Sequence, residues 1–358
     1  MFVCLVLFLW PCRGVATDLA MVGLGTAGIE KVSTILEAIQ MGYRTLDTAL
    51  IYRNHQMVRE AIVKSGIDRE EFFLTSKVGF FPSSMALPEE HQPAFGLEAL
   101  PIPSDLPFHP LNVKGKEIEA IELSLKELGV QYLDLCLIHV PATSALELSA
   151  SFFPHLYGLW PKLTKWTETT VLGALNALTI QEVKHRQSVA KQERKRSWQN
   201  MEAAKKRGLC RHIGVSNYPV DFMKEIDEYK TEPIYNQQQE LHPLAQFRDV
   251  QEYARKAKVA LTGYGTGVVV STPLAQEIAL KMNRSAGQVL LRWAVQKGVH
   301  VTPKSNQVSR LKENLEVLDF ALDEEDMAAL DSLDGSKIFY WNTTILVPQA
   351  SPVARAEL

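Results

Sequence analysis

Short apolar runs alternate with amphipathic stretches along most of this chain of 358 residues. The apolar runs are rich in Val, Ile, Leu and Thr, and the stretches between them carry apolar side chains at helical spacing. Such an alternation is typical of βα units that build a parallel sheet. We predict eight strands, at residues 21–26, 45–49, 72–78, 133–140, 212–216, 234–240, 260–265 and 300–305.

The amphipathic stretches predict the helices that connect these strands. They lie at residues 31–41, 56–64, 116–128, 197–207, 247–256, 286–297 and 310–318. Eight strand–helix units in one chain favour an α/β fold of the closed (β/α)8 TIM barrel type over an open sheet. We therefore interpret the glycines of residues 23–28 as belonging to the first barrel strand and its turn.

Two connections are longer than a barrel requires. Residues 79–113 follow the third strand and are rich in Pro, whereas residues 141–196 follow the fourth strand and end in a basic run at 184–196. We interpret the basic run as a solvated helix face, with nucleic-acid or membrane contact as the alternative. Because both insertions follow strands, we expect them on the C-terminal face of the barrel, over an active site.

The barrel itself is assigned to residues 17–335, and residues 336–358 form a C-terminal tail. Residues 1–16 are a short apolar run followed by Gly14, Val15 and Ala16, a pattern that signal peptidase accepts. This segment is interpreted as a signal peptide, which would send the protein into the secretory pathway, as a buried N-terminal segment, or as the product of a wrongly chosen start codon. It is too short to span a bilayer well.

The composition limits the partners that we expect. A hydrophobic content of 46% is enough for a substantial core, and a net charge of -3 with a pI near 6.3 provides no global basic field. We therefore expect no nucleic-acid partner and no stable membrane span. We also expect a monomer.

Cysteines are few, at Cys4, Cys12, Cys136 and Cys210, and show neither a disulfide framework nor the spacing of a zinc site. Cys136 lies in the apolar run LDLCLIH, where we expect a small buried side chain. The sequence therefore predicts a fold that depends on neither a disulfide nor a metal.

Chemically useful side chains close several of the predicted strands. Asp47, Lys77, His139 and Ser216 each stand at a strand end, where barrel enzymes place their working groups, and Tyr52 follows five residues after Asp47. Each has a structural alternative when taken alone: a helix cap, a surface cation or a buried core histidine. Their joint placement favours a single site.

The chemistry of these groups suits proton transfer to a carbonyl. A tyrosine has a reference pKa of about 10, and a nearby ammonium such as that of Lys77 lowers it by stabilising the phenolate. Asp47 can hold Lys77 in place by a charge-assisted hydrogen bond. His139 can donate a hydrogen bond to a carbonyl oxygen and aim it at Tyr52, which completes a general-acid site.

The stretch from Gly42 to Tyr52, G-Y-R-x-x-D-T-A-x-x-Y, resembles the first signature of the aldo-keto reductases. The family's tetrad of Asp, Tyr, Lys and His matches Asp47, Tyr52, Lys77 in LTSK and His139 in LIHVP. The resemblance implies that Tyr52 is the proton donor, that a nicotinamide supplies hydride, and that the protein works in the cytoplasm. It covers about residues 20–335 without the two insertions.

Other family motifs follow in order, and the resemblance implies a role for each. Ser216 and Asn217 in GVSN would hold the nicotinamide carboxamide together with Gln238, for which Gln237 is a rival, and Tyr264 would stack on the nicotinamide. In PKSNQVSRLKEN, the positions matched by Lys304, Ser305 and Arg310 bind the adenosine 2′-phosphate, while Glu313 and Asn314 match residues that reach the adenine. Two cations beside a helix start favour NADPH over NADH.

The chain departs from the family where tryptophans often line the pocket, since Ala27, Gly79 and Val140 occupy those places. Aromatic residues of the insertions, such as Phe80, Phe81, Phe152 or Trp160, can replace those walls. The sequence therefore predicts NADPH-dependent reduction of an aldehyde or ketone, without naming the substrate. The alternative is an NADPH-binding regulatory or scaffold subunit with little turnover, for which the rebuilt pocket and the basic run are the motivation.

Overall fold

The computed structural model describes residues 18–78, 115–141, 180–335 and 337–339. It contains an eight-stranded sheet in which every strand lies beside its neighbour in sequence, and every pair is parallel. The strands are β1 (Leu24–Gly25), β2 (Thr45–Asp47), β3 (Phe73–Val78), β4 (Leu133–Ile138), β5 (Cys210–Ser216), β6 (Asn236–Glu240), β7 (Ala260–Tyr264) and β8 (His300–Val301). All eight predicted strands are confirmed.

The two edge strands of this sheet also meet. Val22 forms a parallel bridge with Val301, and the Gly23 amide donates to the Val301 carbonyl at 2.8 Å. One step further, the Gly25 amide donates to the Pro303 carbonyl at 3.0 Å. A Cβ on Gly25 would lie 2.6 Å from the Thr302 carbonyl oxygen, so this close approach needs glycine. The sheet therefore curls round as the predicted (β/α)8 architecture requires.

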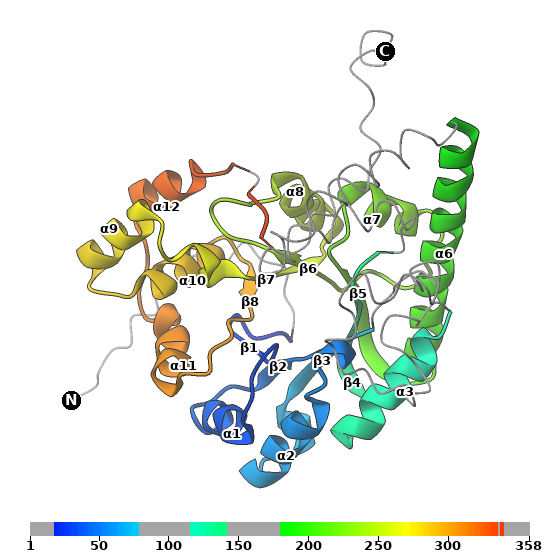
Figure 1. Cartoon of the computed structure of the whole chain (residues 1–358), viewed down its shortest axis with the longest axis horizontal. Coiled ribbons are helices and arrows are strands. Elements are labelled where there is room, and N and C mark those ends of the chain that lie inside the picture. Colours follow the sequence, from blue (N-terminus) through cyan, green and yellow to red (C-terminus); the bar gives the residue numbers. More distant parts are fainter. Residues whose placement is uncertain (1–17, 79–114, 142–179, 336, 340–358) are drawn as a thin grey trace, which may run out of the picture.

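Helices surround the strands, as Figure 1 shows. Their apolar faces pack on the outside of the sheet and form one continuous core with it. The α-helices are α1 (Val32–Gln40), α2 (His55–Ser65), α3 (Glu117–Leu128), α6 (Ile180–Lys206), α7 (Val220–Asp227), α8 (Arg248–Ala257), α9 (Pro273–Met282), α10 (Ala286–Gln296), α11 (Val308–Leu315) and α12 (Glu324–Asp331). Short 3-10 helices are η1 (Leu50–Tyr52), η2 (Arg69–Glu71), η9 (Thr266–Val269) and η10 (Glu316–Leu318).

The sequence pattern missed α7, α9 and α12. Two of them, α7 and α12, have only eight residues, so an apolar period has few turns in which to repeat. In α9 the apolar Leu280 is 85% exposed, which blurs the distinction between its polar and apolar faces. All three nevertheless bury residues in the layer between helices and sheet.

Helix α6 is longer than predicted, because it begins at Ile180 instead of residue 197. Much of the basic run at 184–196 is therefore the body of a helix and not the end of an insertion. Arg194 in this run is buried. It donates to the Glu225 carboxylate of α7 through Nε at 2.8 Å and Nη2 at 2.9 Å, and its guanidinium lies over the Phe222 ring. The interpretation of the whole run as a solvated face was wrong for this residue, since it attaches α6 to α7.

A disulfide joins Cys136 of β4 to Cys210 of β5, and both residues are buried. The sequence did not predict this disulfide, although burial of Cys136 is confirmed. The two cysteines are 74 residues apart in sequence, and only the pairing of β4 with β5 brings them together. No cluster of metal ligands occurs among the described residues, and none of the helices they form is long and apolar enough to cross a membrane.

The N-terminal segment 1–16, the first insertion and most of the second lie outside the described residues, as does nearly all of the tail. From the tail, the Lys337 amide donates to the Leu244 carbonyl at 2.8 Å and the Phe339 amide to Glu240 Oε1 at 2.7 Å. The chain thus returns to the carboxyl end of β6 after its last helix.

Candidate active site

Four ionisable side chains meet at the carboxyl ends of the first strands. Asp47 ends β2, Lys77 is the penultimate residue of β3, and His139 directly follows β4, while Tyr52 ends the 3-10 helix η1. Lys77 Nζ donates to Asp47 Oδ1 at 2.5 Å and to the Thr48 carbonyl at 3.1 Å, and it lies 3.4 Å from the Tyr52 hydroxyl. The structure therefore brings together the four residues that the sequence predicted as catalytic.

The Lys77–Asp47 ion pair is almost entirely withdrawn from water. The side chains are 1% and 6% exposed, respectively. A buried charge is tolerated only when it is paired and hydrogen-bonded, and the second carboxylate oxygen of Asp47 meets this need by accepting from Gln238 Nε2 at 2.8 Å. The two charges are thus held in place by each other and by β6.

The Tyr52 phenol keeps its proton at neutral pH. Burial raises its pKa above the ordinary value, the Lys77 ammonium lowers it, and the Asp47 carboxylate raises it again. The contribution of Lys77 has the predicted sign, but burial outweighs it. Burial by itself would lower the pKa of Lys77, yet Asp47 and Tyr52 raise that pKa above its usual range, so Lys77 stays charged.

His139 is neutral under the same conditions. Burial, with a further contribution from the Lys77 ammonium, lowers the pKa of its imidazole to about 3. Its ring meets the Tyr52 ring edge-on with 5.9 Å between centroids. A neutral imidazole beside a protonated phenol offers two hydrogen-bond donors to one acceptor oxygen.

A second group of predicted residues lies on β5, β6 and β7. Asn217 adopts a left-handed conformation with φ of 60°, and its Nδ2 donates to the His139 carbonyl at 2.9 Å and to Ser216 Oγ at 3.1 Å. Its Oδ1 accepts from the Tyr264 hydroxyl at 2.7 Å. The Asn217 amide donates to the Gln238 carbonyl at 2.9 Å, and Gln238 donates to Asp47, so this group is linked to the Lys77–Asp47 pair.

The geometry separates Gln238 from its rival Gln237. Successive side chains of a strand point to opposite faces of the sheet. Gln238 reaches Asp47 inside the barrel mouth, whereas Gln237 Nε2 donates at 3.0 Å to the carbonyl of Tyr218, in the layer outside the sheet. Only Gln238 shares the site.

The predicted phosphate-binding residues lie after β8. Lys304 is three residues beyond the end of that strand and is exposed, and Arg310 is exposed in the first turn of α11. Ser305 is buried, and its Oγ accepts from the Gln307 amide at 2.9 Å, which shapes the turn into the helix. The N-cap residue Gln307 makes no side-chain cap hydrogen bond, so the positive end of the helix is open to an anion.

The two residues predicted to reach the adenine lie in the last turn of α11. Glu313 Oε2 accepts from Ser285 Oγ at 3.2 Å, at the start of α10. The Asn314 side chain lies near the Tyr43 hydroxyl, which donates to the Leu311 carbonyl at 2.9 Å. Both side chains are partly buried.

Of the pocket positions that depart from the family, Ala27 is exposed and Val140 is buried at the mouth. Gly79 and the aromatic residues Phe80, Phe81, Phe152 and Trp160 lie outside the described residues.

The sequence reasoning missed two buried residues directly after the Tyr52 turn. They are Asn54 and His55, which bind residues at the ends of β1, β2 and β3. The only sequence signal for them is a polar pair at the start of α2, and such a pair is typical of an ordinary helix N-terminus.

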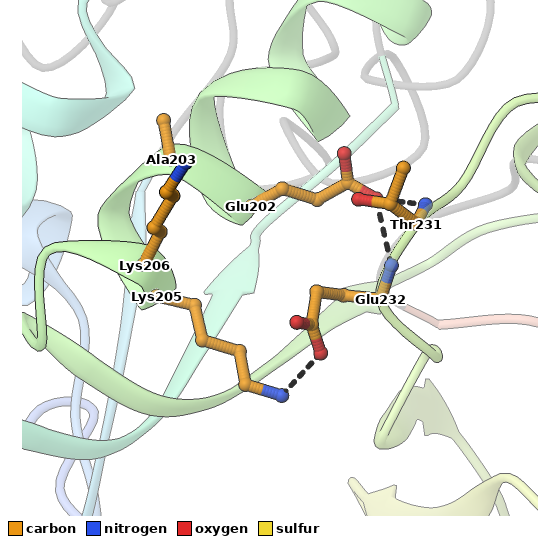
Figure 2. Close-up of a pocket in the computed structure, with 6 residues that line it drawn as sticks. All are labelled: Glu202, Ala203, Lys205, Lys206, Thr231 and Glu232. Carbon is orange, nitrogen blue, oxygen red and sulfur yellow. Dashed lines mark hydrogen bonds and ion pairs between the residues drawn. The ribbon is translucent and has the colours of Figure 1, made fainter.

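A surface hollow lies at the other end of the barrel. Its lining comes from the C-terminal end of α6 and from residues 231–232, which precede β6, as Figure 2 shows. Lys205 Nζ pairs there with Glu232 at 2.6 Å, and Glu202 Oε1 accepts from the amides of Thr231 and Glu232. These contacts of Glu202 and Lys205 attach α6 to the chain before β6.

Comparison with known proteins agrees with this architecture. The model of the aldo/keto reductase family matches residues 22–276 and 269–335. Glyoxal reductase of Bacillus subtilis (strain 168) is 30% identical over 311 residues, which cover 86% of this chain and 84% of that protein. NADP-dependent D-sorbitol-6-phosphate dehydrogenase of Malus domestica is 30% identical over 341 residues, covering 88% and 91%, respectively.

A solved structure is also similar, that of an aldo-keto reductase enzyme from a Medee basin deep-sea metagenome library. It is 26% identical, has a TM-score of 0.64, and the match covers 91% of this chain and 96% of that one. The chain therefore belongs to the aldo/keto reductase family. Members of this family are oxidoreductases that reduce aldehydes and ketones with nicotinamide cofactors.

Proposed function

We propose that this protein reduces an aldehyde or ketone to the alcohol with NADPH, and that Tyr52 is the general acid. The observation that carries the proposal is the position of the Tyr52 hydroxyl, 3.4 Å from a buried Lys77 ammonium that is itself paired with Asp47. When bound, the nicotinamide supplies the hydride that goes to the carbonyl carbon.

The proton comes from this chain. As negative charge develops on the carbonyl oxygen, Tyr52 gives up its phenolic proton to that oxygen, and Lys77 stabilises the phenolate that remains. Asp47 holds the ammonium at the correct place, so no reorganisation is needed at that moment. His139 is neutral and donates a second hydrogen bond to the same oxygen, which fixes the carbonyl for attack.

The residues around Asn217 suit the amide end of a nicotinamide. Ser216, Asn217 and Gln238 offer hydroxyl and amide groups on adjoining strands, and the half-buried Tyr264 ring lies beside them. Such a set gives both donors and acceptors for a carboxamide and an aromatic face for its ring.

Residues after β8 suit the 2′-phosphate that distinguishes NADPH from NADH. Lys304 and Arg310 are exposed cations, and the start of α11, whose N-cap side chain makes no cap hydrogen bond, adds the partial positive charge of the helix dipole. Ser305 shapes the turn between them, while Glu313 and Asn314 offer polar groups to the adenine. The relative from Malus domestica is named NADP-dependent, which supports the same choice.

The alternative of a non-catalytic NADPH-binding subunit is not adopted. The described residues include the complete group of Asp47, Tyr52, Lys77 and His139. Cofactor binding alone would not require Tyr52 beside Lys77. The similarity to glyoxal reductase also points to turnover of small aldehydes.

The test is substitution of Tyr52 by Phe, with turnover of glyoxal, methylglyoxal and para-nitrobenzaldehyde followed by NADPH oxidation. We expect a loss of about 100-fold or more, because general-acid catalysis contributes on the order of 10²–10⁴-fold. NADPH binding, measured by fluorescence quenching, stays within a factor of about two.

The matched control is Tyr253→Phe, which removes a hydroxyl that donates to Asp227 at 2.7 Å on the outside of the barrel. This variant should keep the wild-type rate. Equal activity of Tyr52→Phe and Tyr253→Phe would refute Tyr52 as the acid. A folded, NADPH-loaded wild type that turns over none of a broad carbonyl panel would instead favour the non-catalytic alternative.

A further inference from the structure

The turn that carries Tyr52 has an unfavourable backbone conformation. Arg53, directly after Tyr52, is in the left-handed region with φ of 55°, which a residue with a side chain rarely adopts. Such a conformation persists only where the surroundings impose it. The next two residues, Asn54 and His55, are both buried and provide that constraint.

Asn54 attaches the turn to the ends of β1 and β2. Its Nδ2 donates to the Thr26 carbonyl at 2.7 Å, and its Oδ1 accepts from Thr48 Oγ1 at 3.0 Å. Thr48 is also the residue whose carbonyl accepts from Lys77 Nζ, and Thr26 Oγ1 donates to the Asp47 carbonyl at 3.0 Å. One side chain therefore links the Tyr52 turn to the backbone around the ion pair.

His55 attaches the turn to β3 and α3. Its Nδ1 lies 3.0 Å from Glu127 Oε2 in the last turn of α3, and its Nε2 lies 3.1 Å from Ser76 Oγ. Both contacts are satisfied when Nδ1–H donates to the carboxylate and Nε2 accepts from the hydroxyl. Ser76 immediately precedes Lys77, so His55 connects the base of the tyrosine turn to the strand that bears the ammonium.

The order Ser76, His55, Glu127 has the hydrogen-bond pattern of a hydrolase triad, but it lacks access to a substrate. Ser76 is 2% exposed, and its hydroxyl faces α2 and α3 on the outer face of the sheet. Lys77, its neighbour, points to the opposite face, toward Asp47 and Tyr52. The group therefore has a positional role and no nucleophilic one.

We propose that Asn54 and His55 are positioning residues that clamp the Tyr52 turn from two sides and set the distance between the Tyr52 hydroxyl and Lys77 Nζ. Asn54 fixes the turn to β1 and β2, and His55 fixes it to β3 and α3. This inference rests on the proposed function, because the distance matters only if Tyr52 is the acid. Misplacement of a reacting group by about 1 Å can cost on the order of 100-fold in rate.

The test compares kcat with cofactor binding in clamp variants, with whichever of the three aldehydes the wild type reduces fastest. His55→Leu, which loses both hydrogen bonds, should lower kcat by about 10- to 100-fold while NADPH affinity stays within about twofold. Ser76→Ala removes only the β3 side and should cause a smaller loss. His55→Gln and His55→Asn, which can each keep one of the two bonds, should recover part of the rate.

The matched control is Glu252→Gln, which breaks an exposed ion pair with Lys256 on α8 and should leave kcat unchanged. Thermal unfolding shows that each variant is folded at the assay temperature. If His55→Leu does not fold, kcat is compared between Ser76→Ala and Glu127→Gln. Ser76→Ala breaks the link to β3 and should lower kcat more than Glu127→Gln, which preserves an acceptor for the His55 Nδ1–H.

A double-mutant cycle separates this inference from the proposed function. If the clamp acts through Tyr52, Tyr52→Phe with His55→Leu should be no slower than Tyr52→Phe alone in single-turnover assays. The clamp would be overturned if the rate losses of Tyr52→Phe and His55→Leu multiplied in the double variant. It would also be overturned if His55→Leu and Ser76→Ala both kept the wild-type kcat. In either case Tyr52 would remain the acid. Full activity of Tyr52→Phe would overturn the proposed function itself.

Discussion

The mouth of the barrel has two sides that differ in how they treat charge. The acid side consists of Asp47, Tyr52, Lys77 and His139; its charged groups are buried and paired within the protein. The proposed phosphate side consists of Lys304, Ser305 and Arg310, and both of its cations are exposed beside a helix start without a side-chain cap.

The two sides differ in the burial of their cations because the opposing negative charge arises at a different time on each side. Under the proposed function, negative charge appears on the acid side only during the reaction, so the ammonium must already be desolvated and held by Asp47. On the proposed phosphate side, the negative charge would arrive with the cofactor, and cations that remain hydrated until then carry no burial penalty. The acid side should therefore control rate and stability, whereas the phosphate side should control affinity and respond to salt.

The largest expected effect is on the acid side, for Lys77→Met. Removal of the ammonium leaves the Asp47 carboxylate buried without its cation, which typically costs about 3–5 kcal/mol in the free energy of unfolding. We also expect turnover to fall by at least about 100-fold, because the phenolate loses its stabilising charge. Urea unfolding and NADPH oxidation measure the two effects.

Lys64→Met is the control for that variant. Lys64 pairs with Glu60 at 2.7 Å, but the two side chains are 56% and 51% exposed, respectively. Its removal should change stability by less than about 0.5 kcal/mol. Similar losses in both variants would contradict the contrast between buried and exposed ion pairs.

A smaller effect is expected on the phosphate side. Lys304→Met combined with Arg310→Met should weaken NADPH binding on the order of 100-fold, or about 2.7 kcal/mol, and should leave NADH binding almost unchanged. The wild-type preference for NADPH should also fall as ionic strength rises. Titration of both cofactors by fluorescence, at low and high salt, provides the measurement.

Lys312→Met on the same helix is the matched control, since its side chain is 74% exposed and lies near Glu316. It should not alter cofactor preference. A parallel loss of NADPH and NADH affinity in the double variant would refute the assignment of the 2′-phosphate to Lys304 and Arg310.

The smallest expected effect is a pH dependence of stability from His139. In the folded protein its imidazole has a pKa of about 3, against a reference value of about 6.5 in the unfolded chain. Below pH 6.5 the unfolded chain binds a proton at His139 that the folded protein does not bind. Stability is therefore lost as the pH falls from 6.5 toward 3. Between pH 6.5 and 5 the loss should be about 1.5 kcal/mol.

Urea unfolding of wild type and His139→Asn across this range isolates the contribution, because His212 and His300, whose pKa values burial also lowers, are present in both. The variant should show a shallower slope. Identical slopes would indicate that the pKa of His139 is the same in the folded and unfolded states.

The sequence located the strands more reliably than the ends of the helices. A strand buried on both faces gives a short apolar run, and Asp47 and Ser216 close their strands as predicted. Helix α6 was placed too late because its first turns are too polar for an apolar period. Asn54 and His55 were missed because their roles depend on contacts with residues up to 72 positions away.

By itself, the sequence determined the alternation of strands and helices and the identity of the groups at the carboxyl ends of the strands. Local periodicity and residue chemistry are sufficient for both. Only the tertiary structure decided that Gln238 and not Gln237 meets Asp47, that Cys136 joins Cys210, and that burial outweighs Lys77 in the pKa of Tyr52. These properties depend on which groups share a desolvated space, and that is fixed only when the barrel is assembled.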